Sequence, residues 1–239
     1  MQNLNIENLL IIDIETVSQY ACFDELPLNW QQLWSEKISY YLSEQETANE
    51  YYNKKAAILA EFGKIICISA GYFKKENGQY QLRIKSFSGD NEKMILESFI
   101  ESLDQWYNIK KNISFCGHNV KEFDLPYICR RLLVNQLNIP NYLNFQSMKP
   151  WETNIVDTMQ FWKFGDYKNY ISLNLLAACL VIDSPKTDMD GSKVGEVYWK
   201  EKNIQKIVDY CQKDVITVGQ IILKMKGLSI LSEDKIVIT

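Results

Sequence analysis

The feature that most constrains the fold is an apolar run near the start of the chain that ends in two carboxylates, Leu-Leu-Ile-Ile-Asp-Ile-Glu over residues 9–15. Four consecutive large aliphatic residues indicate a β-strand that is buried on both faces, which is typical of a central strand in an α/β sheet. Side chains two positions apart on a strand point the same way, so Asp13 and Glu15 should project from one face.

Two neighbouring carboxylates repel each other and are costly to bury unless a cation lies between them. Oxygen ligands of this kind suit Mg²⁺ or Mn²⁺. The alternative is a solvated strand end, because roughly one Asp-x-Glu is expected by chance in a chain of this size. Asp13 and Glu15 therefore need partners elsewhere in the chain before they indicate a metal site.

Composition excludes several classes of protein and of site. With 46% hydrophobic residues, the 239-residue chain can bury one substantial core. No apolar run approaches the length of a membrane span and the first dozen residues lack the pattern of a signal peptide, so we expect a cytoplasmic protein. The six cysteines form no CxxC pair and His118 is the single histidine, which leaves little material for a zinc site or a Ser-His-Asp triad. Any chemistry should depend on carboxylates.

The formal net charge of −4 argues against binding of nucleic acid through overall charge. It does not exclude nucleic acid, because two divalent cations held by four clustered carboxylates would offset this charge and attract phosphate. Composition leaves both possibilities open.

The hydrophobic pattern predicts alternating strands and helices in one domain over residues 1–239, without a repeat or linker. Asn77-Gly78 predicts a hairpin between two strands that begin near residues 65 and 80. A helix capped by Asp90 should follow. The remaining predicted elements are a strand at 113–116, a helix from the region of Pro126 to about 137, a strand or loop at 155–157, a short helix at 173–180 and a long helix at 204–226.

Residues 17–62 interrupt the connection between the first two strands and indicate a helical insertion. Its Trp30, Trp34, Ile38 and Tyr41 are spaced three and four residues apart, which is typical of a packed helix face. The alternative use of these aromatic side chains is to stack unpaired bases.

Three motifs follow one another on the predicted strands and helices. Taken singly, each is explained by a solvated carboxylate or a half-buried tyrosine that packs. Together and in this order, they resemble the DEDD superfamily of 3′-5′ exonucleases, in its tyrosine-bearing branch. The motifs are Asp13-x-Glu15 at the end of the first strand, Asn119-x-x-x-Phe123-Asp124 after the strand at 113–116, and Tyr210-x-x-x-Asp214 in the last helix.

A closer resemblance is to the proofreading exonuclease domain of family B DNA polymerases, and it covers essentially the whole chain. It implies a stand-alone, DnaQ-like exonuclease with an α/β, ribonuclease H-like fold, in which a mixed sheet of about five strands is flanked by helices, with a helical insertion after the first strand. The segments that carry it are Phe123-Asp124-Leu125-Pro126 with Arg131, Ser172-Leu173 to Leu180, Asp188-Met189-Asp190-Gly191 and Tyr210-Cys211-x-x-Asp214-Val215.

The resemblance also implies a role for each motif residue. In-line displacement at a phosphodiester needs an activated water and a cation on the leaving oxygen, which two metal ions provide. Tyr210 would help to hold the attacking water. Two divalent cations, Mg²⁺ or Mn²⁺, would be bound by Asp13, Glu15, Asp124 and Asp214. Substrate contacts would come from Thr16, Asn119 and Phe123. The implied function is removal of nucleotides from the 3′ end of single-stranded nucleic acid, with DNA favoured by the likeness to polymerases.

Some alternatives remain open. The histidine branch of the superfamily needs a histidine shortly before the last aspartate, and His118 lies beside the second motif instead, so we interpret it as a packing or hydrogen-bonding neighbour. Four lysines, at positions 163, 168, 186 and 193, either grip the strand backbone or lie in solvated segments. The rival functions are a catalytically silent module that binds nucleic acid or a protein partner, and an exoribonuclease of the same fold.

Overall fold

The structure is a computed structural model, and it describes residues 4–42, 46–110, 112–146, 148–149, 152–166, 168, 170–183 and 189–239. Within these residues, six strands form one mixed sheet in the order β5-β4-β1-β2-β3-β6. The strands are β1 (Leu9–Ser18), β2 (Gly63–Glu76), β3 (Gln79–Ser88), β4 (Ser114–Gly117), β5 (Ile155–Asp157) and β6 (Ile236–Ile238). The central place of β1, parallel to β4 and antiparallel to β2, confirms the prediction from its apolar run.

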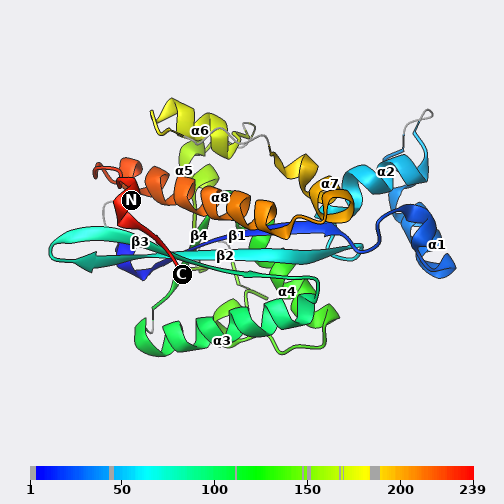
Figure 1. Cartoon of the computed structure of the whole chain (residues 1–239), viewed down its shortest axis with the longest axis horizontal. Coiled ribbons are helices and arrows are strands. Elements are labelled where there is room, and N and C mark those ends of the chain that lie inside the picture. Colours follow the sequence, from blue (N-terminus) through cyan, green and yellow to red (C-terminus); the bar gives the residue numbers. More distant parts are fainter. Residues whose placement is uncertain are drawn as a thin grey trace.

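Helices cover both faces of this sheet. Figure 1 shows α8 lying along one face, with α5 and α6 on the same side, and α3 and α4 on the other. None of the helices in the described ranges is long and apolar enough to cross a membrane. The helices are α1 (Leu28–Ile38), α2 (Ala48–Lys55), α3 (Glu92–Lys110), α4 (Asp124–Val134), α5 (Thr158–Lys163), α6 (Leu173–Cys179), α7 (Val194–Glu196) and α8 (Ile204–Met225).

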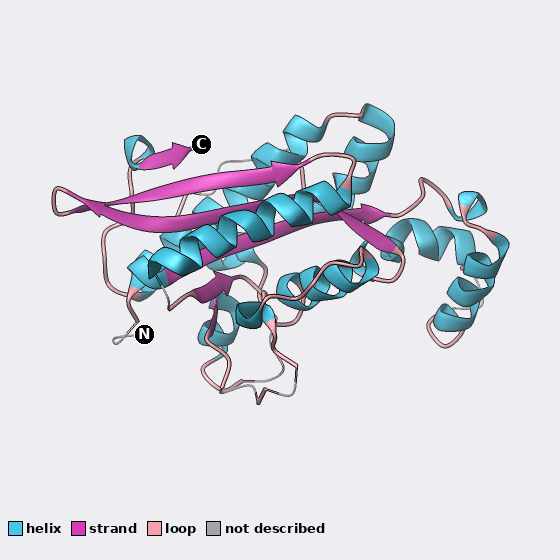
Figure 2. Ribbon diagram, turned by 90° about the horizontal axis from the view of Figure 1, so that it is seen from below, coloured by secondary structure: helices cyan, strands magenta, loops and turns pink. Residues whose placement is uncertain are grey.

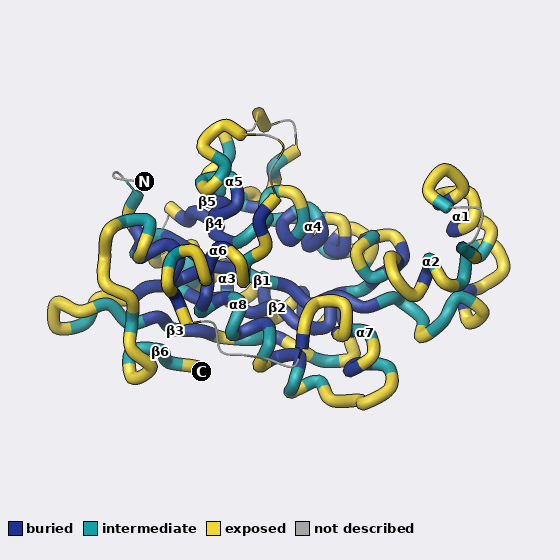
Figure 3. The backbone as a smooth tube through the Cα atoms, turned by 90° about the horizontal axis from the view of Figure 1, so that it is seen from above, coloured by how far each residue is buried: buried dark blue, intermediate teal, exposed yellow. Residues whose placement is uncertain are grey.

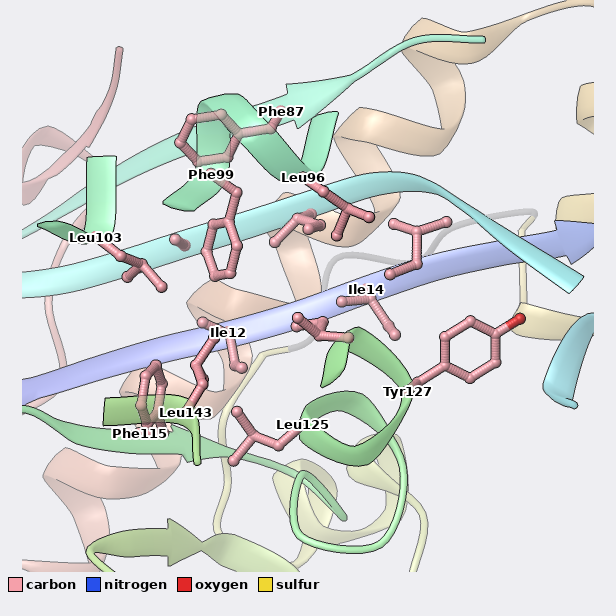
Figure 4. Packing of buried hydrophobic residues seen from close by; sticks show 14 of the residues in the cluster. Ile12, Ile14, Phe87, Leu96, Phe99, Leu103, Phe115, Leu125, Tyr127 and Leu143 are labelled. Carbon is pink, nitrogen blue, oxygen red and sulfur yellow. The ribbon is translucent and has the colours of Figure 1, made fainter. Parts of the chain in front are cut away.

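Alternate side chains of β1 belong to two different cores. Leu10, Ile12 and Ile14 pack in the cluster formed with α3 and α4, and Figure 4 shows Ile12 and Ile14 among its members. Leu9 and Ile11 pack in a second cluster, whose helical part comes from α8. The strand is therefore buried on both faces, because each face meets a helix layer.

The hairpin between β2 and β3 turns at Asn77 and Gly78, as predicted. Both residues have positive φ angles, 50° and 82°, which is the backbone that an Asn-Gly hairpin turn requires. Figure 2 shows this hairpin reaching beyond the helices. The short edge strand β6 pairs with β3 and raises the strand number from the expected five to six.

Three boundaries differ from the predictions. The helix α4 ends at Val134, about three residues before the predicted end near residue 137. The cap of α3 is Asn91, whose side chain accepts a hydrogen bond from the Met94 amide at 3.2 Å. Asp90 is not the cap, because its carboxylate instead accepts the Tyr198 hydroxyl at 2.8 Å. At the insertion, β1 continues to Ser18, so the segment between β1 and β2 begins two residues later than the predicted residue 17.

The insertion carries α1 and α2, which project beyond the end of the sheet (Figures 1 and 3). Trp34 and Ile38 are buried in its own small aromatic core, which confirms the packing interpretation for these two residues. Tyr41 is 70% exposed, so for this residue the prediction of a packed helix face was wrong. The helix α1 ends at Ile38, three residues before Tyr41.

Candidate active site

Asp13 and Glu15 lie on the face of β1 that α8 covers. They continue the alternation of Leu9 and Ile11, which pack against that helix. Directly after Glu15 the pairing of β1 with β2 changes register, from Glu15 opposite Cys67 to Thr16 opposite Ile65. Such irregularities bend a strand and change the direction of side chains, and they are frequent beside active sites.

Helix α8 brings the third motif over these carboxylates. The Asn203 side chain caps the helix by accepting the Lys206 amide at 3.1 Å. About two turns beyond the cap, the Cys211 thiol donates to the backbone carbonyl of Asp13 at 3.4 Å, which fixes the contact between α8 and β1. One potential ligand atom from each of Asp13, Glu15 and Cys211 lies within 4.8 Å of the others.

Asp124 is the first residue of α4 and is 4% exposed. β4 pairs with β1 only at residues 9–11, so the strand runs past its partner before it reaches Ile14. The Asp124 carboxylate accepts the Ile14 amide there at 3.0 Å. The second motif is thus tied to β1 between Asp13 and Glu15, because a buried amide needs an acceptor where the ladder has ended.

Asp157, at the end of β5, holds the loop of the second motif and was not predicted as a site residue. Its carboxylate accepts the backbone amides of Asn119 at 3.0 Å and Lys121 at 3.1 Å, and it also caps α5 through the Met159 amide. The available signal was the sequence Ile-Val-Asp, because an apolar strand that ends in an acid repeats the pattern of β1.

These elements enclose a cavity of about 260 Å³. Seven of the eight predicted site residues line it, and Asp214 lies one helical turn beyond Tyr210. No lysine or arginine is among the described residues of the lining. A larger cavity of about 640 Å³ borders α4 and contains none of the four carboxylates. The lining of the smaller cavity is Asp13, Ile14, Glu15, Thr16, Ala57, Ile58, His118, Asn119, Phe123, Asp124, Gly191 and Tyr210.

Burial raises the pKa values of all four carboxylates, and neighbouring carboxylates add to the shift for Asp13, Glu15 and Asp124. Burial, followed by the charges of Glu15, Asp124 and Asp214, raises the pKa of Asp13 well above its ordinary value. Glu15 shows the same direction of pKa shift, through burial and then the charge of Asp214. Burial raises the pKa of Asp124 to about 7 and that of Asp214 to about 6. The cluster therefore holds protons more tightly than isolated carboxylates do.

The donor set fits a divalent cation. The Oδ2 atom of Asp13 is buried and has no hydrogen-bond partner. None of the ion pairs in the described ranges involves Asp13, Glu15, Asp124 or Asp214. Burying carboxylates without a positive partner is costly, and a hard divalent cation that binds their oxygens offsets this cost.

Tyr210 lies beside the cluster, with its hydroxyl within hydrogen-bonding reach of the Asp214 carboxylate. Burial, followed by the charges of Asp214, Glu15 and Asp13, raises the pKa of Tyr210. The phenol is therefore protonated at neutral pH and can donate a hydrogen bond, but it is a poor base.

His118 bridges two segments. Its Nε2 donates to the Ile171 carbonyl at 2.8 Å, and its Nδ1 lies 2.9 Å from the Thr158 hydroxyl. Burial lowers the pKa of His118, so the ring is neutral at neutral pH. These contacts confirm the interpretation as a hydrogen-bonding neighbour. Of the four lysines, Lys186 lies outside the described residues, and the Lys163 ammonium lies over the Tyr170 ring at 4.3 Å.

Comparisons with known proteins begin with the fold. A family B DNA polymerase from the hyperthermophilic archaeon Pyrobaculum calidifontis is similar in structure, with a TM-score of 0.53 and 13% sequence identity. The likeness covers 91% of this chain and 24% of the polymerase chain, so the chain spans only a minor part of that protein. At this identity the likeness concerns the fold alone, and it shows the ribonuclease H-like sheet that the resemblance implied. No curated protein matches the chain.

A family model described as a predicted 3′-5′ exonuclease related to the exonuclease domain of PolB matches residues 57–234. The match covers about three quarters of the chain. It includes Asp124, Tyr210 and Asp214, whereas Asp13 and Glu15 precede it. With most of its length matched, the chain belongs to this family of predicted 3′-5′ exonucleases related to the exonuclease domain of PolB.

Proposed function

We propose that this protein is a metal-dependent exonuclease that hydrolyses phosphodiester bonds at the 3′ end of single-stranded DNA. One observation carries the proposal. Four buried or half-buried carboxylates from β1, α4 and α8 have raised pKa values, first of all through burial, and have no cationic side chain as an ion-pair partner within the described residues. Membership of the exonuclease family supports the same activity.

Asp13 and Glu15 from β1, Asp124 from α4 and Asp214 from α8 would hold two divalent cations, Mg²⁺ or Mn²⁺. When bound, these cations activate water and offset the negative charge that develops at the phosphodiester. The carboxylates need to be ionised to act as ligands, and cation binding favours ionisation in the same way as a neighbouring positive charge. Together these residues would supply a carboxylate-rich end of the cavity that is complementary to metal and phosphate.

Tyr210 would orient the attacking water. Its hydroxyl is protonated, because burial and neighbouring carboxylates raise its pKa. A donor held beside Asp214 can fix the position of a water molecule without accepting its proton. The water's proton would therefore pass to a group other than the phenol.

The rest of the lining suits the terminal nucleotide. The Oδ1 atom of Asn119 is buried without a hydrogen-bond partner, so it is available to a substrate donor. Thr16 and Phe123 line the same cavity. A space of about 260 Å³ lies below the roughly 300–1,000 Å³ range of ordinary ligand pockets, which favours one unit of a single strand over a base pair. A paired end would have to be unpaired first, which costs free energy.

A 5′-labelled oligonucleotide tests the proposal. Incubation with Mg²⁺ or Mn²⁺ should give a ladder of progressively shorter labelled products, and EDTA should abolish it. Immediate release of a labelled mononucleotide would show attack from the 5′ end and contradict the proposal. Absence of cleavage with every cation would support the silent binding module instead.

Matched DNA and RNA oligonucleotides separate the two enzymatic alternatives. We propose DNA because of the likeness to a family B DNA polymerase. Discrimination depends on contacts to the 2′-hydroxyl. Faster digestion of the RNA strand under identical conditions would favour the exoribonuclease.

A further inference from the structure

A second charged cluster lies near the candidate active site, and it consists of cations. Lys64 is at the start of β2, beside the last residues of β1. Its ammonium group lies 4.9 Å from the centroid of the Tyr198 ring and 5.1 Å from that of the Trp199 ring. The Lys202 ammonium lies 5.0 Å from the same Trp199 centroid. The two lysines and the two aromatic residues together form what we call the lysine cluster.

An unusual backbone carries three of these residues. Tyr198 and Trp199 belong to a π-helical turn (Val197–Glu201), a rare geometry that is frequent at functional sites. Lys202 follows with a φ angle of 55°, in the left-handed region that favours glycine or asparagine. Strained positions of this kind are kept where the surrounding structure requires them, and they gather at functional sites. The backbone therefore points to a use for the Lys202 side chain.

Contacts with the sheet hold Lys64 and the π-helical turn in place. The Lys64 ammonium donates to the Tyr198 hydroxyl at 3.0 Å, and this hydroxyl donates to the Asp90 carboxylate at 2.8 Å. Val197 and Tyr198 are buried in the same apolar cluster as Val17 of β1. Lys64 is thus positioned before a ligand binds, which lowers the cost of ordering its side chain on binding.

The two lysines have no ion-pair partner within the described part of the chain. None of the ion pairs there involves Lys64 or Lys202. By contrast Lys200, on the same π-helical turn, pairs with Glu196 at 3.2 Å. The lysine cluster therefore differs from its surroundings in presenting two cations without a carboxylate on either.

Electrostatics favour an anion at the lysine cluster. Burial lowers the pKa of Lys64, Asp90 and Glu92 oppose this shift, and the charges of Lys202 and Arg131 add to it. Glu92 already binds Arg131 through both of its carboxylate oxygens, at 2.8 and 2.6 Å. An anion between the two ammonium groups would offset their mutual repulsion.

The aromatic rings indicate which part of a nucleotide fits. Both rings are faced by ammonium groups, so they hold the lysines and do not present a free face to a base. An ammonium group is a compact point charge that binds phosphate. The lysine cluster therefore suits a phosphate group, whose recognition carries no information about base sequence.

One continuous segment links the lysine cluster to the active-site cavity. Gly191 lines the cavity, and the chain runs from there through a 3₁₀ turn (Gly191–Lys193), α7 and the π-helical turn to Lys202. Figure 1 shows α7 beside the beginning of α8. Because the segment is helical, Gly191 and Lys202 are no more than about 20 Å apart. A strand of about six nucleotides covers this distance even at the phosphate spacing of a duplex.

We propose that the lysine cluster binds a backbone phosphate of the nucleic-acid strand, a few nucleotides before its 3′ end. This inference rests on the proposed function, which makes a single strand the ligand. The net charge of the chain is −4, and the described lining of the cavity contains no lysine or arginine. A strand that extends beyond the cavity therefore needs a local cation, and the lysine cluster supplies two.

Fluorescence anisotropy of a 5′-labelled single-stranded DNA tests the site. A strand of about 12 nucleotides has twice the length needed to reach the cluster. EDTA in the buffer prevents metal-dependent cleavage during the measurement. The affinity is measured over a range of salt concentrations, and the Tm of each variant shows whether it is folded.

The variants remove or retain the charge at each position. Lys202→Asn removes one charge, and asparagine tolerates the positive φ angle at this position. Lys64→Gln removes the other charge, and Lys64→Arg retains it. Lys200→Gln is the matched control, because it removes a charge from the same turn at a lysine that is already paired with Glu196.

At low salt, Lys202→Asn and Lys64→Gln should each weaken binding about three- to tenfold, and Lys64→Arg should match wild type. In the variant that combines the first two changes, the slope of log Kd against log salt concentration should become shallower by about 0.7, the contribution of one phosphate on a single strand. Lys200→Gln should change the affinity by less than about twofold.

A second strand, with neutral methylphosphonate linkages in place of the phosphates before its 3′-terminal part, separates phosphate binding from a change in protein shape. The affinities of wild type and the double variant should converge on this strand, because it offers the lysine cluster no anion. A difference that persists there would show a structural effect of the substitutions and overturn the site.

Equal affinities of wild type and the double variant for the charged strand would also overturn the site, including the case in which the cluster takes only a free phosphate ion. That result would leave the exonuclease function standing. Lysine-dependent binding by a protein that cleaves no strand with any cation would overturn the proposed function and leave a strand-binding site.

Discussion

The two faces of β1 make opposite contributions to the molecule. On the face toward α3 and α4, Leu10, Ile12 and Ile14 are all buried in a continuous apolar cluster. On the face toward α8, the apolar residues Leu9 and Ile11 are followed by Asp13 and Glu15. Because successive side chains alternate, a shift of one residue in register would exchange the two faces. The apolar face therefore fixes which way the carboxylates point.

The face toward α8 carries buried carboxylates that repel one another, and the other face carries none. Burial and mutual repulsion raise the pKa values of the carboxylates, and no ion pair within the described ranges offsets them. Apolar packing elsewhere on the sheet has to outweigh this cost in the metal-free protein. Substitutions on the two faces should accordingly have opposite effects on stability and on cleavage.

The largest expected effect comes from removing a proposed ligand on the α8 face. Asp13→Ala or Asp214→Ala should lower the rate of cleavage to below about a hundredth, since bound metal ions supply several kcal/mol of transition-state stabilisation. The Tm in EDTA should stay constant or rise, because one source of repulsion is gone. Rates come from the labelled oligonucleotide at saturating Mg²⁺. Either variant retaining more than a tenth of the wild-type rate would refute the metal assignment.

The reverse pattern is expected on the other face. Ile12→Ala leaves a cavity in the cluster with α3 and α4 and should lower the free energy of unfolding by about 2–5 kcal/mol. Urea titration measures this loss. At low temperature, where the variant remains folded, its cleavage rate should lie within about threefold of wild type, because no proposed ligand has changed. A folded variant without activity would show that the two faces are not separable.

Tyr210→Phe should have an intermediate effect on cleavage. It removes only the hydroxyl beside Asp214, so the rate should fall about 10- to 100-fold, the scale of losing one positioned polar group. Mn²⁺ affinity, measured by calorimetry, should change little. His118→Asn is the control, and its pH-rate profile should keep the wild-type shape because burial lowers the pKa of this histidine. A changed profile in His118→Asn with an unchanged rate in Tyr210→Phe would reverse the two roles.

The smallest expected effect is a dependence of metal-free stability on pH. The folded-state pKa values of Asp124 and Asp214, about 7 and about 6, lie above the ordinary value near 4. Between about pH 4 and pH 7 the folded protein thus binds more protons than the unfolded chain. The stability that these two groups contribute is fully present near pH 4 and is lost as the pH rises through 6 and 7. In EDTA the free energy of unfolding should fall by about 1–3 kcal/mol from pH 6 to pH 8.

Asp124→Asn is the matched control for this titration, because its amide oxygen can still accept the Ile14 amide. The variant should show a weaker dependence on pH. A wild-type stability that rises over the same interval would contradict the repulsion described for the carboxylates.

Local patterns explain how much of the fold could be predicted. β1, α8 and the hairpin at Asn77 and Gly78 followed from runs, periodicity and turn chemistry that lie within each segment. β6 was missed because three residues show no periodicity and its partner β3 lies about 150 residues earlier. The cap of α3 was misplaced by one residue because Asp90 and Asn91 are both suitable caps, and the distant Tyr198 binds one of them.

The residues of the candidate site also fall into two groups, those that local motifs predict and those that depend on distant contacts. Motif spacing predicted Asp13, Glu15, Asp124 and Tyr210, and the structure brings them to one cavity. Ile58 reaches the same cavity through contacts from α4, and no local pattern indicates it. Asp157 acts through backbone amides 36 and 38 residues away, which a pattern within one segment does not reveal.

The most direct test of the account is a count of Mn²⁺ ions bound by the wild-type protein, with Asp13→Asn and Ile12→Ala as comparisons. Calorimetric titration at pH 8, where the carboxylates ionise most readily, should show two ions per wild-type chain and two for folded Ile12→Ala. Asp13→Asn should bind fewer or bind more weakly, because a ligand has lost its charge. A wild-type protein that binds no Mn²⁺ and degrades DNA at full rate in excess EDTA would contradict the central claim.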